Sequence, residues 1–388
     1  MMKKVLFAAT VVKTHIMEFH IPYLKMFKEA GWETAVASRN DYANPADCMI
    51  PYCDIFYDVP FVRNPFHPKN LAALRQLKKI IDSGGYDIIH CHTPVGAMLT
   101  RIAARKARKR GTTVIYTVHG LHFYTGAPPV NWLLYYPEER LLAHWTDILI
   151  TINKEDYERA KHFKAGRVEY VPGVGIDLNR FCAGEGVDRE KKREELGLAP
   201  DEFVLLSVGE LIARKNHRVV LEALKLLREQ GRLEGIRYVI CGSGKLEGEL
   251  KALASAYGLD GMVSFLGYRT DVNEIYRCCD LFVFMSFQEG LPVALMEAMA
   301  TGLPVVCTDI RGNNDLIENG KSGEIIGNSA GELADAIMKM KDRPNVRVGY
   351  ARKAEETIQE FGLEKVEEKM RKIYFGEPKG TVPNGLSH

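Results

Sequence analysis

Short apolar runs alternate with amphipathic stretches of helical length along the whole chain, and this alternation limits the folds available to it. The apolar runs are nearly continuous, which is typical of strands covered on both faces. Strands that alternate with helices in this way indicate βαβ units and parallel sheets. Strands are therefore predicted at residues 5–9, 34–38, 88–91, 114–118, 148–152, 168–171, 203–208, 238–241, 263–266, 281–285, 304–308 and 324–326.

A segment rich in Pro and Gly at residues 171–177 divides this series into two halves. A chain of 388 residues is also too long for one ordinary core. We therefore expect an α/β fold with two Rossmann-like, doubly wound domains that face each other across a cleft and bind ligands at the carboxyl ends of their strands. The predicted parts are an N-terminal domain (1–172), a C-terminal domain (173–355), a helix that packs back on the N-terminal domain (356–375) and a flexible tail (376–388).

The composition indicates a globular protein in a reducing compartment, which we take to be the cytoplasm. Apolar residues make up 46% and charged residues 26% of the chain. The eight cysteines are scattered, which is not the pattern of a disulfide framework. The apolar run at residues 5–12 is followed by Lys13, His15 and Glu18 without a cleavage site, so we interpret it as a buried strand and not as a signal peptide.

The net charge is distributed unevenly. Residues 1–172 carry a net charge of +7 and the remainder carries −5. Basic residues cluster at 101–110, with Arg75, Lys78 and Lys79 in addition. Two interpretations stay open: these side chains contact an anionic membrane surface, or they form solvated helix faces. Nucleic-acid binding is disfavoured because no aromatic platform or recognised module accompanies the basic residues.

Residues 287–300 carry the most informative motif. They follow an apolar strand, and Pro292 stands where a helix is expected to start. The backbone N–H groups of Gly290, Leu291 and Val293 are then available to an anion such as a diphosphate. Glu289 and Glu297 bracket this anion site, and carboxylates accept hydrogen bonds from sugar and ribose hydroxyls.

Residues 208–217 supply cations near the end of another strand. A leaving diphosphate accumulates negative charge, and the chain has no Asp-x-Asp metal motif to neutralise it. Lys215 and Arg214 are therefore the candidates for this role, although a solvated surface position remains open for Arg214.

The two glutamates, seven residues apart in the context EGLPVALMEAMATGLPVV, resemble the E-x7-E motif of retaining GT-B enzymes in glycosyltransferase family 4. The resemblance implies that Glu289 contacts the donor sugar and that Glu297 contacts the nucleotide ribose. The family usually has a lysine at the place of Lys215. Its arginine directly after the strand glycine is replaced here by Glu210.

The resemblance extends to the nucleotide base. In the family, the glycines after the next strand and the strand with the pattern V-x-F-L-G line the base pocket. It therefore implies that Gly242 and Val263 contact the base, while a tight turn and core packing are the alternatives for these two residues.

The first half resembles exopolysaccharide and capsule members of the same family at residues 86–94, 116–124, 136–140 and 151–156. By this resemblance His119, at a strand end, contacts the donor sugar. The loop at residues 8–15 lacks the glycines that family members commonly have, but His15, Glu18 and His20 lie close to it in the sequence.

Histidines and a cysteine in the same half invite a zinc interpretation. They are His90, Cys91, His92, His119 and His122. Strand alternation sends His90 and His92 to one face and Cys91 to the other, so we do not expect a tetrahedral metal site.

The resemblance implies a retaining, metal-independent transfer without a cofactor. A hexose or N-acetylhexosamine would pass from a nucleotide-diphosphate sugar, by family analogy a UDP-sugar, to a polyprenyl-diphosphate-linked saccharide at the inner face of the plasma membrane. A nucleotide-sugar 2-epimerase on the same fold and a transferase to a soluble acceptor are the alternatives. A sugar-binding module without catalysis is disfavoured by the two phosphate-binding signals. A dinucleotide oxidoreductase is disfavoured because neither half opens with G-x-G-x-x-G.

Overall fold

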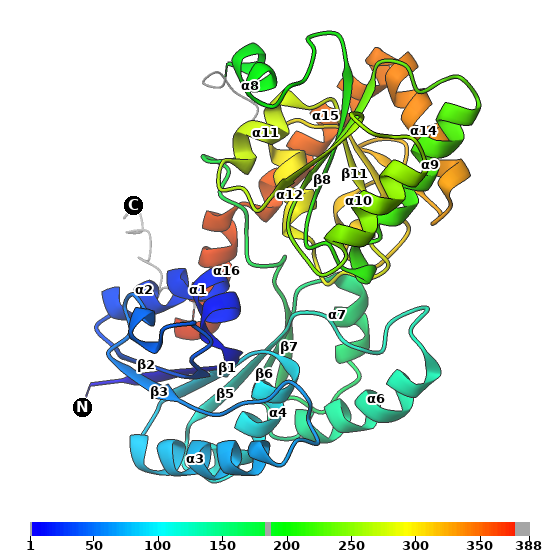
Figure 1. Cartoon of the computed structure of the whole chain (residues 1–388). Coiled ribbons are helices and arrows are strands. Elements are labelled where there is room, and N and C mark those ends of the chain that lie inside the picture. The colour runs from blue at the N-terminus through cyan, green and yellow to red at the C-terminus, as the bar shows by residue number, and fades with distance from the viewer. Residues whose placement is uncertain (1, 183–187, 377–388) are drawn as a thin grey trace, which may run out of the picture. The chain divides into compact units, whose positions relative to one another are not determined.

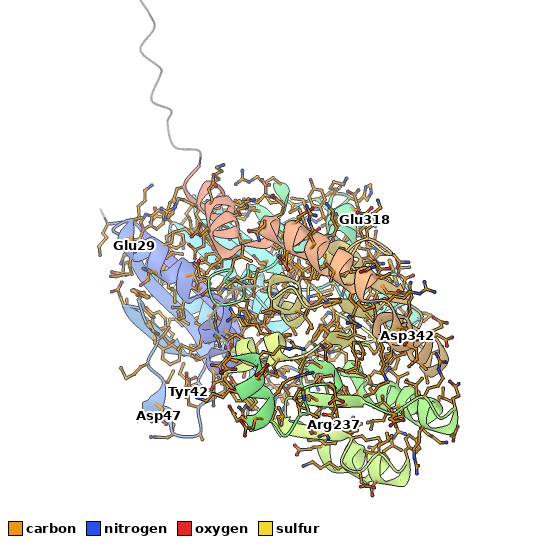
Figure 2. All side chains as sticks on the ribbon, turned by 90° about the horizontal axis from the view of Figure 1, so that it is seen from above. Glu29, Tyr42, Asp47, Arg237, Glu318 and Asp342 are labelled. Carbon is orange, nitrogen blue, oxygen red and sulfur yellow. The ribbon has the colours of Figure 1, made fainter. Side chains whose placement is uncertain are left out.

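A computed structural model describes residues 2–182 and 188–376 of the chain, and these residues form two compact units (Figure 1). The first unit runs to Val174 and includes the C-terminal part of the chain from Glu364, and the second unit comprises Gly175–Leu363. Residues 377–388 of the predicted tail are outside the described residues. Figure 2 labels residues of the first unit (Glu29, Tyr42, Asp47) and of the second (Arg237, Glu318, Asp342).

The first unit is built on one parallel sheet. Its strands are β1 (Lys4–Val11), β2 (Glu33–Arg39), β3 (Ile55–Asp58), β4 (Ile88–Cys91), β5 (Thr113–Val118), β6 (Ile148–Thr151) and β7 (Arg167–Tyr170). They follow the order β3-β2-β1-β4-β5-β6-β7. The strand order reverses between β1 and β4, and such a reversal is where doubly wound sheets place their ligands.

Helices cover both faces of this sheet (Figure 1). They are α1 (Met17–Phe19), α2 (Ile21–Glu29), α3 (Lys69–Gly84), α4 (Pro94–Ala103), α5 (Arg105–Lys109), α6 (Pro129–Ala143), α7 (Lys154–Ala160) and α16 (Leu363–Phe375). Side chains of β1 alternate between two cores: Leu6 and Ala8 share one with α3 and α4, whereas Phe7 shares the other with α2 and α16. Both faces of the strand are therefore buried, as its continuous apolar sequence predicts.

The second unit has a parallel sheet of its own. Its strands are β8 (Phe203–Val208), β9 (Ile236–Cys241), β10 (Val263–Gly267), β11 (Leu281–Phe284), β12 (Val305–Thr308) and β13 (Glu324–Ile326), in the order β10-β9-β8-β11-β12-β13. The order reverses between β8 and β11. The prediction of two Rossmann-like domains with parallel sheets is confirmed.

The helices of the second unit are α8 (Arg189–Glu195), α9 (His217–Glu229), α10 (Glu247–Ala256), α11 (Val272–Cys278), α12 (Val293–Ala300), α13 (Asn313–Leu316), α14 (Ala330–Asp342) and α15 (Pro344–Ile358). Helix α9 shows why they pack: Val220, Leu224 and Leu227 recur at helical spacing and are buried in one core with α10, α14 and β8.

Three elements differ from the prediction. The edge strand β3 was not predicted, because its short sequence is only half-buried and ends in the exposed Asp58. From the sequence alone, one continuous helix is predicted at residues 95–110, whereas the structure has two helices, α4 and α5, that meet at Ala104. The last helix, α16, begins at Leu363 and not at residue 356, and its residues Val366 and Met370 pack in the core of the first unit.

Both interpretations of the basic cluster at residues 101–110 assumed that its side chains are exposed. The structure differs from this at Arg101. Arg101 is buried, forms an ion pair with Glu139 at 2.8 Å and lies over the ring of Tyr116. Removal of one partner from a buried ion pair leaves an uncompensated charge, so Arg101 and Glu139 depend on each other in the packing of α4 against α6. Within the described ranges, no helix has both the length and the apolar character needed to cross a bilayer.

Candidate functional site

The carboxyl ends of β8 and β11 bring together two segments that the sequence singled out. The first segment forms a 3-10 turn, Ala213–Lys215, after β8. The second follows β11 and leads into α12. The backbone N–H of Phe287 donates to the carbonyl of Arg214 at 2.9 Å, which ties the two segments together. They therefore meet where the strand order of the second sheet reverses.

Two cations converge on Glu289 at this point. Lys215 Nζ lies 2.8 Å and an Arg214 terminal nitrogen lies 2.7 Å from the same carboxylate oxygen, Oε1. Lys215 is also positioned 4.8 Å from the ring centre of Phe284, in a cation–π contact. Arg214, Lys215 and Glu289 thus form one compact group with a net positive charge, which suits the binding of an anion.

Helix α12 begins beside this group, at Val293, with Pro292 as the N-cap residue, one residue later than predicted. Its first N–H groups have no acceptor within the helix and carry partial positive charge. Gly312 lies against the carbonyl of Gly290, where a Cβ at residue 312 would come within 2.6 Å of that oxygen. The loop after β12 can therefore pack closely on the turn that leads into α12.

Arg311 is a third cation of this region that the sequence analysis missed. It is buried, and its Nε donates to the backbone carbonyl of Glu289 at 3.1 Å. It follows β12, whose carboxyl end lies at the same edge of the sheet as the ends of β8 and β11. Its place in the sequence was the available signal, since Arg311 is a cation three residues after the end of a buried parallel strand.

Glu297 lies within α12 and is mostly buried. Burial raises the pKa of its carboxyl group to about 7, although the nearby Tyr276 hydroxyl and Arg180 favour the ionised form. The Tyr276 hydroxyl lies 2.9 Å from Glu297 Oε2 and 2.9 Å from the carbonyl of Ala294, and it has one proton for these two acceptors. When that proton goes to Ala294, a protonated Glu297 can donate to the tyrosine oxygen.

The structure separates the two residues assigned to the base by resemblance. Gly242 follows β9 and packs on the turn after β8, where a Cβ on Gly242 would lie 1.9 Å from the carbonyl oxygen of Gly209. Val263 is instead the first residue of the edge strand β10, whose far end, Gly267, pairs with Cys241 beside Gly242. Val263 therefore does not lie with Gly242 at the carboxyl ends of the strands.

The first unit has a cavity of about 440 Å³ at the carboxyl ends of its strands. Polar and aromatic side chains line it, among them Thr10, His15, Arg63, His119, Tyr135 and Glu138. Burial raises the pKa of Glu138 to about 6. Such a mixture of apolar rings, hydroxyls and charged groups is typical of a site for a polar small molecule.

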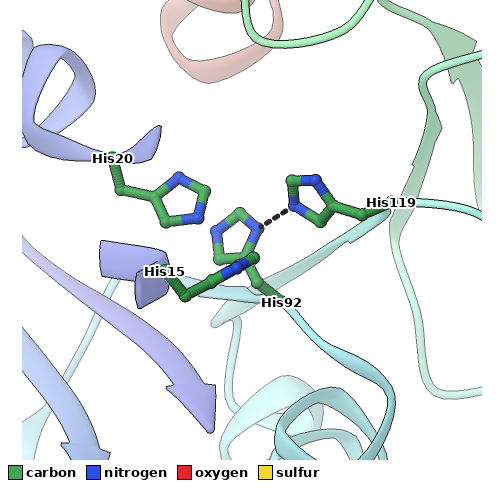
Figure 3. Close-up of side chains that lie close together, drawn as sticks. All are labelled: His15, His20, His92 and His119. Atoms are coloured by element: carbon green, nitrogen blue, oxygen red, sulfur yellow. Dashed lines mark hydrogen bonds between the residues drawn. The ribbon is translucent and has the colours of Figure 1, made fainter. Parts of the chain in front are cut away.

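His119 follows β5 and lies in a group of histidines beside this cavity (Figure 3). Its Nε2 is 3.5 Å from Nδ1 of His92, and His15 and His20 complete the group. Of the five side chains considered for zinc, the structure thus brings together His92 and His119. The other two members, His15 and His20, come from the segment after β1, which was not considered for a metal site.

Comparison of the sequence with known protein families identifies the chain as a glycosyltransferase. Residues 188–357 match the family described as "Glycosyl transferases group 1", and residues 4–153 match the family described as "Glycosyl transferase 4-like". EpsD of Bacillus subtilis, which carries a glycosyltransferase name, is 41% identical over 378 residues that cover 96% of this chain and 97% of EpsD. The chain belongs to the glycosyltransferases. This glycosyltransferase is therefore an enzyme that uses nucleotide sugars, as predicted.

One further relative and one solved structure are informative. An Escherichia coli enzyme, UDP-Gal:alpha-D-GlcNAc-diphosphoundecaprenol alpha-1,3-galactosyltransferase, is 30% identical to this glycosyltransferase and covers 82% of it, with 83% of the enzyme matched. The crystal structure of HepE from Anabaena, in complex with UDP and glucose, superposes with a TM-score of 0.77 at 20% identity and covers 96% of this chain and 99% of HepE. The latter likeness confirms the predicted GT-B fold.

Proposed function

We propose that this glycosyltransferase transfers a hexose or N-acetylhexosamine from a UDP-sugar to a polyprenyl-diphosphate-linked saccharide, with retention of the anomeric configuration and without a metal ion. The observation that carries the donor half of this proposal is the convergence of Lys215 and Arg214 on Glu289 beside the start of α12. The name of the E. coli relative supports UDP as the nucleotide and a lipid diphosphate as the carrier of the acceptor.

The donor diphosphate binds at the carboxyl end of the second sheet. As the glycosidic bond to phosphate breaks, the leaving diphosphate gains negative charge, and Lys215, Arg214 and the first N–H groups of α12 stabilise it. Protein cations thereby take the part that a divalent ion has in other transferases. Glu289 holds the two cations in place and accepts hydrogen bonds from the sugar hydroxyls, and Glu297 accepts from the ribose.

The acceptor saccharide binds in the cavity of the first unit. Tyr135 and His122, whose rings stack with centres 4.6 Å apart, offer a surface for a sugar ring, and Arg63 and Glu138 offer polar contacts. His119 contacts the sugar that is transferred. The acceptor hydroxyl forms its bond to the anomeric carbon on the face from which the diphosphate leaves, and its proton passes to the leaving phosphate oxygen.

Product NMR tests this mechanism. With an α-linked UDP-sugar as donor, we expect an α-linked product, undiminished turnover in EDTA, and no epimerised donor when the acceptor is omitted. A β-linked product would contradict retention, and loss of turnover in EDTA would contradict metal independence. Release of a 2-epimer from donor alone would favour the epimerase instead. A water-soluble acceptor that reacts faster than a polyprenyl-linked one would contradict the lipid-linked substrate.

We further propose that α6 contacts the inner face of the plasma membrane. Val130, Leu133, Leu134 and Leu141 share one face of this helix at helical spacing and are about half or more exposed, with Leu133 at 74%. Basic residues adjoin the end of the helix: Arg105 lies over the ring of Trp145. An apolar helix face beside exposed cations is the arrangement that binds anionic bilayers.

The double substitution Leu133→Glu with Leu134→Glu is expected to lower binding to vesicles that contain phosphatidylglycerol by about tenfold or more, since it removes buried apolar area and adds negative charge. Vesicle sedimentation measures the effect. Val348→Glu, which changes an equally exposed apolar residue of α15 in the second unit, is the matched control and is expected to leave binding unchanged. Equal binding of all three proteins would contradict the membrane role of α6.

A further inference from the structure

Four imidazoles from separate parts of the first unit converge at the carboxyl ends of its strands (Figure 3). His15 lies in the π-helical turn Val12–Ile16 after β1, His20 lies between α1 and α2, His92 follows β4, and His119 follows β5. One ring nitrogen from each lies within 4.8 Å of the others. The β1–β4 reversal of strand order thus gathers these rings, which the sequence spreads over more than a hundred positions.

The ring nitrogens of this group lack the partners that buried histidines normally have. Nε2 of His15, both nitrogens of His20 and Nε2 of His92 are buried and have no hydrogen-bond partner within the described residues. The neighbouring His90 differs: its Nδ1 lies 2.7 Å from the Tyr374 hydroxyl and its Nε2 lies 2.8 Å from Thr117 Oγ1. His90 is therefore a satisfied core residue, whereas the other rings have nitrogen atoms to offer a ligand.

The spacing of the ring nitrogens approaches that of a tetrahedral site. Nitrogen ligands at 2.0–2.1 Å from a zinc ion are about 3.3 Å apart from one another. Nε2 of His119 and Nδ1 of His92 are 3.5 Å apart. The rings of His20 and His92 stack with centres 3.7 Å apart, so binding an ion requires these side chains to rotate until their nitrogens face the same point.

The burial of these rings disfavours their charged form. Burial lowers the pKa of His119 to about 4. Burial, His119 and Arg63 lower the pKa of His15 well below its usual range, and burial with the neighbouring histidines does the same for His20. Neutral imidazoles keep a lone pair for coordination, and like charges on four adjacent rings are avoided.

We propose that His15, His20, His92 and His119 bind one transition-metal ion of the Zn²⁺ class. A set of four imidazole nitrogens suits Zn²⁺, Co²⁺, Ni²⁺ or Cu²⁺, and not Mg²⁺ or Ca²⁺, which prefer oxygen ligands. His15 and His119 line the 440 Å³ cavity, which provides the path by which the ion enters.

The bound ion inhibits transfer. This second step rests on the role proposed above for His119, whose ring nitrogen the ion would occupy in place of the donor sugar. The four histidines are not among the residues proposed to bind the diphosphate, so metal-independent transfer and inhibition by Zn²⁺ are compatible. The ion is therefore an inhibitor of the enzyme and not a cofactor.

Metal binding is tested without any donor or acceptor. The full-length, untagged, reduced protein is stripped with EDTA, dialysed against Co²⁺ or Zn²⁺, and analysed for bound metal and for visible absorption. We expect one ion per chain, the intense absorption of tetrahedral Co²⁺, and no thiolate charge-transfer band from the eight free cysteines. His20→Gln and His92→Gln are each expected to weaken binding by about tenfold or more.

The exposed His162 provides the matched control, since His162→Gln removes an imidazole outside the group. Thermal unfolding of each metal-free variant checks that it folds, and His15→Gln serves if either of the other variants does not. Wild-type protein without bound Co²⁺, octahedral Co²⁺, or binding that all the variants retain would overturn the proposal.

Inhibition is then measured as turnover against free Zn²⁺, with Mg²⁺ as the control for chelation of the nucleotide. We expect wild-type turnover to fall as the site fills and to return with EDTA. A tetrahedral Co²⁺ spectrum without turnover on any sugar nucleotide would preserve the metal site and reject the proposed function. Full turnover of the zinc-loaded enzyme would preserve binding and reject inhibition.

Discussion

Lys215→Ala is expected to weaken UDP binding by about 10- to 100-fold while the protein stays folded. A hydrogen bond to a charged group contributes about 1.5–3 kcal/mol, and each 1.4 kcal/mol is a factor of ten in affinity. Folding is retained because Arg214 still pairs with Glu289 at 2.7 Å. Isothermal titration calorimetry with UDP measures the effect.

A second substitution separates binding from transfer at the same site. In Glu289→Gln, no carboxylate competes with the diphosphate for Lys215 and Arg214, so we expect UDP affinity that is equal to or higher than that of the wild type. Turnover is expected to fall at least about tenfold, because the sugar loses a charged acceptor. Lys225→Ala, which changes an α9 lysine paired with Glu229, is the control for loss of a cation. Unchanged UDP binding in Lys215→Ala would show that the diphosphate binds elsewhere.

Glu297→Gln is expected to stabilise the protein at pH 8 and yet to weaken nucleotide binding. The pKa of Glu297 is raised to about 7 in the folded protein. The folded state therefore holds this proton more tightly than the unfolded state, and the free energy of unfolding falls as the pH rises from about 4.5 to about 7. Since each pKa unit corresponds to about 1.4 kcal/mol, the substitution removes a penalty of up to about 3 kcal/mol above pH 7.

Urea unfolding at pH 5 and pH 8 measures this difference, which is expected to be small at pH 5 and large at pH 8. The amide can still donate to the Tyr276 oxygen, so packing is preserved. UDP binding is expected to weaken by about tenfold, because an amide is a poorer acceptor for ribose than a carboxylate. Glu234→Gln, at an exposed position of the same unit, is the control. A variant that is no more stable than wild type at pH 8 would contradict the raised pKa of the buried carboxyl group.

Sequence reasoning was most accurate where one local pattern determines the structure. The strands β4, β8 and β13 have the predicted bounds, because each is an uninterrupted, mostly apolar run in a parallel sheet. The order of strands then brings Lys215 and Glu289 together, since both follow strands that are neighbours in the second sheet. Strand ends that meet at one edge of a sheet are predictable from sequence.

Features that depend on three-dimensional neighbours were not predictable in this way. Arg101 belongs to a basic run, and only its pairing with Glu139 explains why it is buried. Val263 matches a family pattern, but the register of β10 places it away from Gly242. Alternation along β4 correctly placed His90 and His92 on one face, with ring centres 4.0 Å apart, and Cys91 in the opposite core. The histidine group was missed because the conformation of the segment with His15 and His20, which brings these rings beside His92, was not predicted.

A crystal structure of the protein with UDP tests the central claim most directly. We expect the pyrophosphate at the start of α12, within hydrogen-bond distance of Lys215 Nζ and of backbone N–H groups at Leu291 to Val293, with the ribose towards Glu297. UDP bound away from the carboxyl ends of β8 and β11, with Lys215 still paired only to Glu289, would contradict it.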